Sequence, residues 1–288
     1  MHVAISGASG FVGSHLSRAL RERGDEITTL VRPEWNVDLV KVRGRKASVG
    51  APGALDGVDA VVNLAGAGVM DARWTPQRLA LVRSSRVETT RKLASAARDL
   101  RVFVSASAIG YYGMRTDDAE LDESSPPGDD VLARICVDWE AAARASCRVA
   151  IARIGIVLGP GGGALARMIP MFRRFVGGPL GSGKQWWSWI HVDDLVRALL
   201  FAIDTPALDG PFDATAPAPA RMDDVARELG AALHRPHALR TPAFALRAAL
   251  GARAEVLLTG QRVLPKKLLA LGFEFRHPAL AGAIRASI

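Results

Sequence analysis

The chain has 288 residues, of which 49% are hydrophobic, and its formal net charge at pH 7 is +8. This size allows one large domain or two unequal ones around buried cores. No run of about 18 apolar residues is present, so no membrane-spanning helix is predicted. Lys and Arg are scattered rather than clustered, which argues against a nucleic-acid partner.

The start of the chain and its cysteines suggest a compartment. M-H-V-A-I-S-G lacks the basic stretch and long apolar run of a secretory signal peptide. Cys136 and Cys147, if they lie on one helix, are about 16 Å apart at about 1.5 Å per residue, too far for a disulfide. Two unpaired thiols fit a reducing compartment, so a cytoplasmic protein is expected. No Cys/His cluster has zinc spacing, so no metal is expected.

Short apolar runs alternate with helical patterns in the first half of the chain. Strands are predicted at 2–6, 26–31, 60–64, 102–106 and 149–154. Helices are predicted at 11–23, 75–98 and 130–146. The second helix begins with Thr75 as cap and Pro76 in the first turn. This alternation predicts an α/β fold with a Rossmann-type doubly wound parallel sheet.

The sequence changes character after Ile156. Gly and Pro become dense over 159–183, and Ala- and Leu-rich helices fill the chain towards its end. We expect a Rossmann domain of residues 1–158 plus about 189–212. Residues 159–188 and 213–288 are expected to form a smaller α/β substrate-binding region.

A glycine-rich turn is the strongest chemical signal. H-V-A-I-S-G-A-S-G-F-V-G follows the first strand and begins the first helix. Gly7 permits a tight turn, Gly10 lets a diphosphate approach, and Gly13 lets the helix pack close to the sheet. The helix N-terminus then offers free N–H groups to an anion. The alternative is a glycine-rich turn without a ligand. The predicted dinucleotide contacts here are Gly7, Ser9, Gly10, Phe11, Val12 and Gly13.

The end of the second strand indicates which dinucleotide binds. An acidic residue there would bind a ribose 2′-hydroxyl, whereas an arginine would meet a 2′-phosphate. The sequence is I-T-T-L-V-R-P, with Arg32 at the strand end and no acid beside it. NADP(H) is therefore the predicted cofactor. The alternative is that Arg32 is a surface arginine.

Small residues and serines follow the later strands. V-V-N-L-A-G-A-G lets an adenine and ribose lie against the backbone, and F-V-S-A-S-A-I-G-Y-Y-G places serines on the nicotinamide side. R-I-G-I-V-L-G-P follows the next strand. Further cofactor contacts are predicted at Leu64, Ala65, Gly66, Ser105 and Arg153.

Together these motifs resemble the extended short-chain dehydrogenase/reductase superfamily, which includes nucleotide-sugar epimerases and dehydratases. The chain is most similar to a subgroup called epimerase family proteins. The shared motifs are N-L-A-G, R-W-T, S-A-S-A-I-G-Y-Y-G, D-W-E, L-G-S-G-K-Q-W-W-S-W-I-H and L-P-K-K-L-L-A-L-G-F-E-F. The resemblance covers nearly the whole chain. It implies an NADP-binding Rossmann domain and a small C-terminal substrate domain, and leaves the substrate undefined.

The resemblance also implies a catalytic serine followed by a Tyr-x-x-x-Lys pair. By order along the chain, Ser107 matches the serine that polarises a carbonyl, while Cys136 and Glu140 replace the tyrosine and lysine. A neighbouring carboxylate raises the pKa of a thiol. Cys136 is therefore expected to be protonated, either as a weak proton donor or as a packed, inert cysteine. Tyr111 and Tyr112, the only tyrosines, are alternative acids.

Three residues are candidates for substrate contact. Arg86 replaces an asparagine of many relatives; its guanidinium either binds a carboxylate or phosphate or is solvated on a helix. G-P-L-G-S-G-K-Q resembles a P-loop, but it ends in glutamine and leads into a strand, so Lys184 is expected on a substrate-facing loop. Trp187 lines a pocket or faces the core.

His191, Asp193 and Asp194 have the look of a catalytic His/Asp group. We expect a structural role instead, with Asp193 capping the next helix and His191 supporting the sheet.

These features predict an NADP(H)-binding oxidoreductase or epimerase-type enzyme. Its substrate is expected to be a small molecule with an anionic or carbonyl group. A monomer or homodimer is expected, without nucleic-acid or membrane partners. The alternatives are an NADP(H)-binding sensor or regulator without turnover, and a redox-neutral isomerase that holds NADP structurally.

Overall fold

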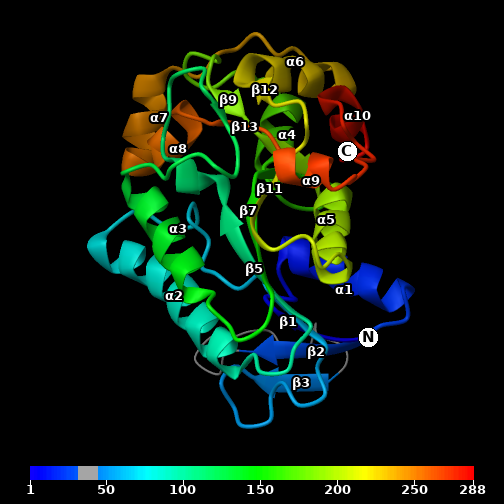
Figure 1. Ribbon diagram of the computed structural model, residues 1–288. Helices are drawn as coiled ribbons and strands as arrows, with labels where there is room; N and C mark the ends of the chain where they lie inside the picture. The colour runs from blue at the N-terminus through cyan, green and yellow to red at the C-terminus, as the bar shows by residue number, and fades with distance from the viewer. Residues whose placement is uncertain (32–44) are drawn as a thin grey trace.

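The computed structural model describes residues 1–31 and 45–288. Within them, seven parallel strands form one sheet in the order β11-β7-β5-β4-β1-β2-β3 (Figure 1). These strands are β1 (His2–Ser6), β2 (Glu26–Val31), β3 (Arg45–Ser48), β4 (Ala60–Asn63), β5 (Val102–Ala108), β7 (Val149–Ile154) and β11 (Gly210–Ala214). After β1 the chain adds β2 and β3 on one side of β1, and it then adds β4, β5, β7 and β11 on the other side. This reversal of strand order confirms the predicted Rossmann-type α/β class.

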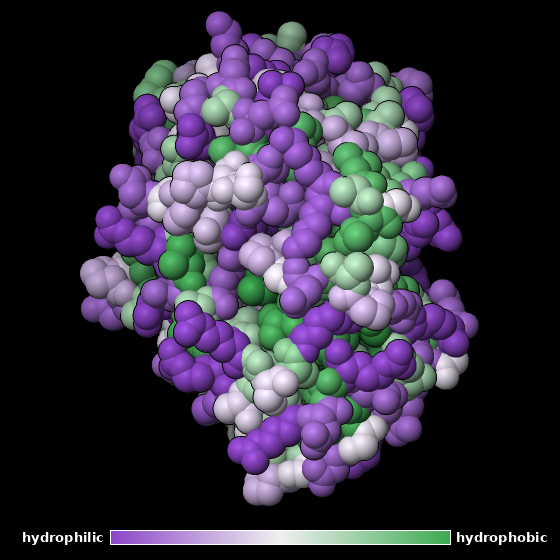
Figure 2. All heavy atoms as spheres, viewed as in Figure 1, coloured by the Kyte–Doolittle hydropathy of each residue, from purple (hydrophilic) through white to green (hydrophobic). Residues whose placement is uncertain are grey.

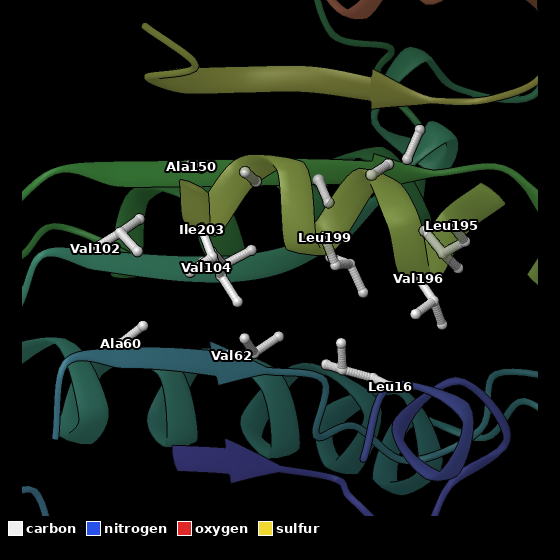
Figure 3. Packing of buried hydrophobic residues seen from close by; sticks show 14 of the residues in the cluster. Leu16, Ala60, Val62, Val102, Val104, Ala150, Leu195, Val196, Leu199 and Ile203 are labelled. Atoms are coloured by element: carbon white, nitrogen blue, oxygen red, sulfur yellow. The ribbon is translucent and has the colours of Figure 1, made fainter. Parts of the chain in front are cut away.

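Helices cover both faces of this sheet. They are α1 (Phe11–Glu22) and α5 (Val192–Asp204) on one face, and α2 (Pro76–Ala96) and α3 (Val131–Ala142) on the other. Val62 of β4 packs in one cluster with Leu16 of α1 and Leu199 of α5 (Figure 3). Its neighbour Val61 packs on the opposite side with Leu93 of α2. Because successive strand residues point to opposite faces, these continuous apolar strands are buried on both sides.

Helix caps agree with the sequence in one case and differ in another. Thr75 caps α2, and its side chain accepts a hydrogen bond from the Arg78 N–H at 3.1 Å, as predicted. For α5 the expected Asp193 cap is wrong: His191 is the cap, and its Nδ1 accepts from the Asp193 N–H at 3.2 Å. The strand β10 (Trp189–His191) runs directly into α5, so its last residue occupies the capping position.

A smaller region lies at the carboxyl ends of the strands, at the top of Figure 1. Its apolar cluster includes Phe172, Trp187, Trp189, Met222 and Ile284. Its remaining elements are η2 (Ile109–Tyr112), β6 (Glu120–Leu121), β8 (Ile156–Leu158), α4 (Leu165–Arg173), β9 (Trp186–Trp187), β12 (Ala220–Arg221), α6 (Met222–Leu233), α7 (Ala243–Leu250), η3 (Gly251–Ala254), α8 (Glu255–Leu258), β13 (Arg262–Val263), α9 (Lys266–Ala270) and α10 (Leu280–Arg285). The segment 189–212 leads the chain back to the main sheet. Its last strand, β11, ends at Ala214, two residues past the expected boundary at 212.

Among residues 1–31 and 45–288, none of the helices combines the length and apolar character needed to span a membrane. On the face drawn in Figure 2, hydrophilic residues predominate and hydrophobic ones gather along the middle.

Candidate functional site

The glycine-rich turn between β1 and α1 packs tightly against neighbouring backbone because its residues are glycines. Gly7 has φ +75°, and a Cβ there would lie 2.8 Å from the Leu64 carbonyl carbon. A Cβ on Gly13 would lie 2.1 Å from the Gly7 carbonyl oxygen. Both positions therefore require glycine for close backbone packing. Gly10 caps α1 without a side-chain hydrogen bond, so the first N–H groups of the helix remain free for an anion.

The neighbouring strand ends complete this cradle. β1, β4 and β5 are adjacent, and the register pairs Ser6 with Asn63 and Asn63 with Ser105. Leu64, Ala65 and Gly66 follow β4, so they lie next to the glycine turn. The predicted cofactor residues of the two turns are thus brought together at the carboxyl edge of the sheet, and they fit a dinucleotide diphosphate. Arg32 lies outside the described residues.

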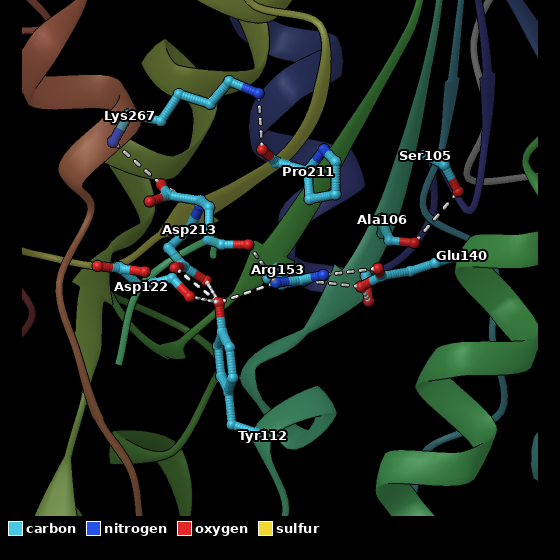
Figure 4. Close-up of polar contacts among 11 residues, drawn as sticks. Ser105, Ala106, Tyr112, Asp122, Glu140, Arg153, Pro211, Asp213 and Lys267 are labelled. Atoms are coloured by element: carbon cyan, nitrogen blue, oxygen red, sulfur yellow. Dashed lines mark hydrogen bonds and ion pairs between the residues drawn. The ribbon is translucent and has the colours of Figure 1, made fainter. Parts of the chain in front are cut away.

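Three polar residues beneath the cradle escaped the sequence analysis. The Ser6 hydroxyl donates to Asn63 Oδ1 at 2.5 Å, and Asn63 Nδ2 donates to Thr90 Oγ1 at 2.7 Å. All three are buried. Ser105, predicted to contact the cofactor, is also buried, and its hydroxyl donates to the Ala106 carbonyl at 3.2 Å (Figure 4). These residues support the edge of the sheet from inside.

Ser107, Glu140 and Arg153 form a buried polar group beside this edge. The Ser107 hydroxyl donates to Glu140 Oε1 at 2.7 Å. Arg153 of β7 donates from Nε and Nη2 to the two Glu140 oxygens at 2.9 and 3.0 Å (Figure 4). Burial disfavours the charged guanidinium, but the Glu140 carboxylate outweighs it and raises the pKa of Arg153. Glu140 Oε1 therefore accepts from both Arg153 and Ser107.

The network continues from Arg153 to a second buried carboxylate. Arg153 Nη1 donates to the Tyr112 oxygen at 3.0 Å, and the Tyr112 hydroxyl lies 2.8 and 2.9 Å from the two oxygens of Asp213. Burial, and then the nearby Glu123 carboxylate, raise the pKa of Asp213 to about 8. Burial, and then Asp213, raise the pKa of Tyr112. A phenol that is 1% exposed and loses its proton less readily is poorly placed as a catalytic acid.

The other two acid candidates lie against the same group. The ring of Tyr111 is half-buried, with its centroid 3.5 Å from the Arg153 guanidinium carbon. Cys136 is buried, and burial followed by the Glu140 charge raises the pKa of its thiol to about 12. The thiol is therefore protonated, as expected, although desolvation contributes more than the carboxylate that motivated the expectation. The structure brings Ser107, Tyr111, Tyr112 and Cys136 together around Glu140 and Arg153.

Two arginines that have no carboxylate partner among the described residues line the loop after β4. Arg86 Nη1 donates to the Ala67 and Val82 carbonyls at 2.8 and 3.1 Å, and Arg78 donates to the Gly68 carbonyl at 2.5 Å. Neither is paired with an acid in the described part of the chain, and the Arg78 Nε is buried without a hydrogen-bond acceptor. Burial lowers the pKa of Arg86. Two guanidinium groups without an acidic partner in the described chain favour an anionic ligand here.

Lys184 and Trp187 lie farther along, in the smaller region. Trp187 is buried in the apolar cluster with Trp189, so the structure favours the core over the pocket for this ring. Lys184 is exposed and lines an open cleft of about 480 Å³, together with Arg221 and Asp223.

Comparison with known proteins identifies the same fold. Residues 3–214 match the NAD dependent epimerase/dehydratase family, and residues 241–287 match a domain of unknown function, DUF1731. The chloroplastic epimerase family protein SDR39U1 homolog of Arabidopsis thaliana is 42% identical, over 99% of this chain and 86% of that protein. An epimerase family protein of Mycobacterium bovis is 41% identical, over 98% of this chain and 96% of that protein.

A solved structure extends the similarity to the coordinates. The crystal structure of the human epimerase family protein SDR39U1, isoform 2, was determined with NADPH. It superposes with a TM-score of 0.91 at 36% identity, over 99% of this chain and 98% of the human one. NADPH is the cofactor that the sequence predicted for the present chain.

Proposed function

Because the chain belongs to the NAD dependent epimerase/dehydratase family, we propose that it binds NADP(H) and acts as an oxidoreductase or epimerase-type enzyme. The Gly7–Gly13 turn and the Leu64–Gly66 loop would hold the dinucleotide. Bound NADP(H) would supply or accept the hydride of the reaction. The substrate is a small molecule with a carbonyl or hydroxyl carbon and, by preference, an anionic group.

The observation that carries the catalytic part is the 2.7 Å hydrogen bond from Ser107 to Glu140. A hydroxyl that donates to an anion has a more electron-rich oxygen, which is a better proton acceptor. A substrate hydroxyl can therefore pass its proton to Ser107 Oγ while the Ser107 proton moves to Glu140 Oε1. In the reverse direction the same two groups return the proton to a carbonyl oxygen. Ser107 is the residue that touches the substrate, and Glu140 acts through it.

Arg153 positions Glu140 for this role. Its two hydrogen bonds fix both carboxylate oxygens and leave Oε1 shared with Ser107. Glu140 thus places a negative charge where the superfamily pattern has the positive charge of a lysine. The change of sign favours proton acceptance by the serine over activation of a tyrosine.

The anionic preference rests on Arg86 and Arg78. Both donate only to backbone carbonyls of the described residues near the loop 66–68. A carboxylate or phosphate on the substrate would bind in two-point fashion to such a guanidinium.

A sensor or regulator that binds NADP(H) without turnover is the second candidate. It is favoured by Cys136 and Glu140 at the positions of the tyrosine and lysine, and by the 2% exposure of Ser107.

Calorimetry with NADPH and NADH, followed by absorbance at 340 nm with a panel of carbonyl compounds, separates these candidates. We expect NADPH to bind more tightly, and Arg32→Asp to weaken NADPH binding more than NADH binding. Ser107→Ala and Glu140→Gln should each lower kcat by about 10²–10⁴-fold, the usual size of an acid–base contribution. The exposed serine variant Ser95→Ala on α2 is the control and should leave kcat unchanged.

Arg86→Met tests the anionic group separately. It should raise KM for substrates with a carboxylate or phosphate and leave KM for neutral analogues unchanged.

Full activity in Ser107→Ala would remove the serine from the mechanism. NADPH binding without turnover of any carbonyl compound would favour the sensor.

A further inference from the structure

Arginines from two parts of the chain converge on the loop between β4 and α2. Arg78 and Arg86 lie on α2, and Arg253 lies in η3 of the smaller region. Each donates to a carbonyl of this loop: Arg86 to Ala67 at 2.8 Å, Arg78 to Gly68 at 2.5 Å, and Arg253 to Met70 at 3.0 Å. Together the three guanidinium groups form an arginine cluster at residues 67–70.

The arginine cluster has no acidic partner in the part of the chain that the structure describes. Arg253 also donates to the Leu250 carbonyl at 3.3 Å, and Arg78 Nε is buried without an acceptor among these residues. The acid of the loop, Asp71, pairs instead with Arg167 of α4 at 3.1 Å. Half-buried cations that are not balanced by the protein favour a bound anion.

The cluster can also receive a ligand. A guanidinium group carries more N–H donors than these backbone carbonyls use. Arg78, Arg86 and Arg253 are half-buried, so each remains within reach of solvent. Arg86 lies close to the loop backbone because residue 66 is glycine: a Cβ there would lie 3.0 Å from the guanidinium carbon. The loop thus holds the arginines in place before a ligand arrives.

Arg86 connects this cluster to the proposed catalytic group. Burial, and then Glu140, raise the pKa of the Cys136 thiol to about 12, whereas the Arg86 charge lowers it. Both charges therefore lie near the same sulfur. The glycine turn, in contrast, contacts the start of the loop at Leu64 and Ala65. The arginines hold a later part of the loop, so a ligand on them need not displace a diphosphate from the glycine turn.

We propose that Arg78, Arg86 and Arg253 bind a phosphate group of the substrate, which makes the substrate a phosphorylated small molecule. This inference rests on the proposed function and narrows its anionic preference. A phosphate ester carries a charge of about −1.5 to −2 at pH 7 and three acceptor oxygens, whereas a carboxylate carries a single charge. Three guanidinium groups without an acidic partner in the described chain match the phosphate better. Because Arg253 comes from the smaller region, the phosphate would also join that region to α2.

The test uses the full chain in a chloride buffer of low ionic strength, saturated with NADPH so that the glycine turn is occupied. Calorimetry with inorganic phosphate should show saturable binding of one ion, which weakens as NaCl is added. Acetate, as the monocarboxylate probe, should bind at least tenfold more weakly. The melting temperature should rise with added phosphate. If NADPH does not bind, the proposed function fails, but phosphate binding to the free chain and its variants still tests this inference.

Variants locate the ion. Arg253→Met should weaken phosphate binding at least about tenfold, the loss of one charge-assisted hydrogen bond, and leave NADPH affinity unchanged. Arg78→Lys keeps the charge but loses the planar fork, and it should weaken phosphate binding if Arg253→Met fails to fold. The matched control is Arg144→Met, an exposed arginine just after α3, which should bind phosphate as wild type does.

Three results would overturn the proposal. Equal phosphate affinities of wild type, Arg253→Met and Arg78→Lys would show that the cluster does not hold the ion. Acetate binding as tight as phosphate binding would remove the preference for a phosphorylated substrate. Competition between phosphate and NADPH, with an equal loss of both in Arg253→Met, would assign the arginines to the cofactor diphosphate instead.

Discussion

Arg153 of β7 holds Glu140 of α3 in a two-point ion pair whose side chains are only 3% and 10% exposed. The pair joins the helix to the strand and fixes the carboxylate that accepts from Ser107. A buried pair of this kind contributes less than its attraction suggests, because both charges lose their hydration. Removing one partner is costly, however, since the other remains buried without compensation.

Glu140→Ala should lower the free energy of unfolding by about 3–5 kcal/mol, because it leaves the Arg153 guanidinium buried and unpaired. The control lies on the same helix: Asp138 pairs with Arg83 at 2.7 Å, and the two side chains are 42% and 52% exposed. Asp138→Ala should cost less than about 1 kcal/mol. Urea unfolding followed by circular dichroism measures both. Equal losses in the two variants would contradict a special role for the buried pair.

Gly13→Ala should disrupt the glycine turn. The added Cβ would lie 2.1 Å from the Gly7 carbonyl oxygen, a backbone atom, so α1 must move away from β1. Overpacking of this kind costs about 1–3 kcal/mol. NADPH affinity, measured by calorimetry on folded protein, should fall as well, because the free N–H groups of α1 move with the helix. Unchanged affinity would mean that the dinucleotide does not use this turn.

Gly282→Ala is the opposite case. Apart from the backbone of its own helix, no heavy atom of the described residues lies within 4 Å of the position that its Cβ would take, and the residue is inside α10 without a positive φ. Alanine has the higher helix propensity, so the variant should gain about 0.5–1 kcal/mol of stability. The unfolding midpoint in urea should therefore increase, and a decrease would show an unrecognised packing role for the glycine.

Asp213 should make stability fall as the pH rises. Its pKa is raised to about 8 in the folded state, from 3.8. Between these values the folded protein keeps a proton that the unfolded chain has lost, so unfolding becomes easier by up to about 1.4 kcal/mol per pH unit. Asp213→Asn does not titrate. Its stability relative to wild type should therefore increase from pH 5 to pH 8, as measured by urea unfolding at each pH. Parallel pH profiles would contradict the prediction.

Cys136 should resist alkylation. Its thiol is buried with a pKa of about 12, whereas Cys147 is only half-buried, although burial raises its pKa too. Because the thiolate is the reactive form, iodoacetamide at pH 8 should modify Cys147 first and Cys136 only after unfolding. Mass spectrometry of native and denatured samples reads out both sites. Fast modification of Cys136 in the native protein would show that the pocket opens.

The local features that the sequence predicted correctly are those set by near neighbours in the chain, such as the turn before α1 and the Thr75 cap. The Gly7–Gly13 turn follows a strand and begins a helix. Thr75 precedes a proline and a helical pattern. About a dozen adjacent residues are enough to recognise either feature. Alternating strands and helices likewise determined the Rossmann class, because each element shows its own period of apolar residues.

Tertiary structure decided which distant side chains meet. Arg153 reaches Glu140 because β7 lies beside β5 and α3 covers that face, and Tyr112 reaches Asp213 because β11 pairs with β7. His277 lies 84 positions beyond Asp193 in the chain, so no local spacing could indicate their contact. The burial of Trp187 could not be predicted from the sequence either. A strand of two residues is too short to show the alternation that separates side chains facing the core from those facing a pocket. Such contacts depend on strand order and helix packing, which local propensities do not specify.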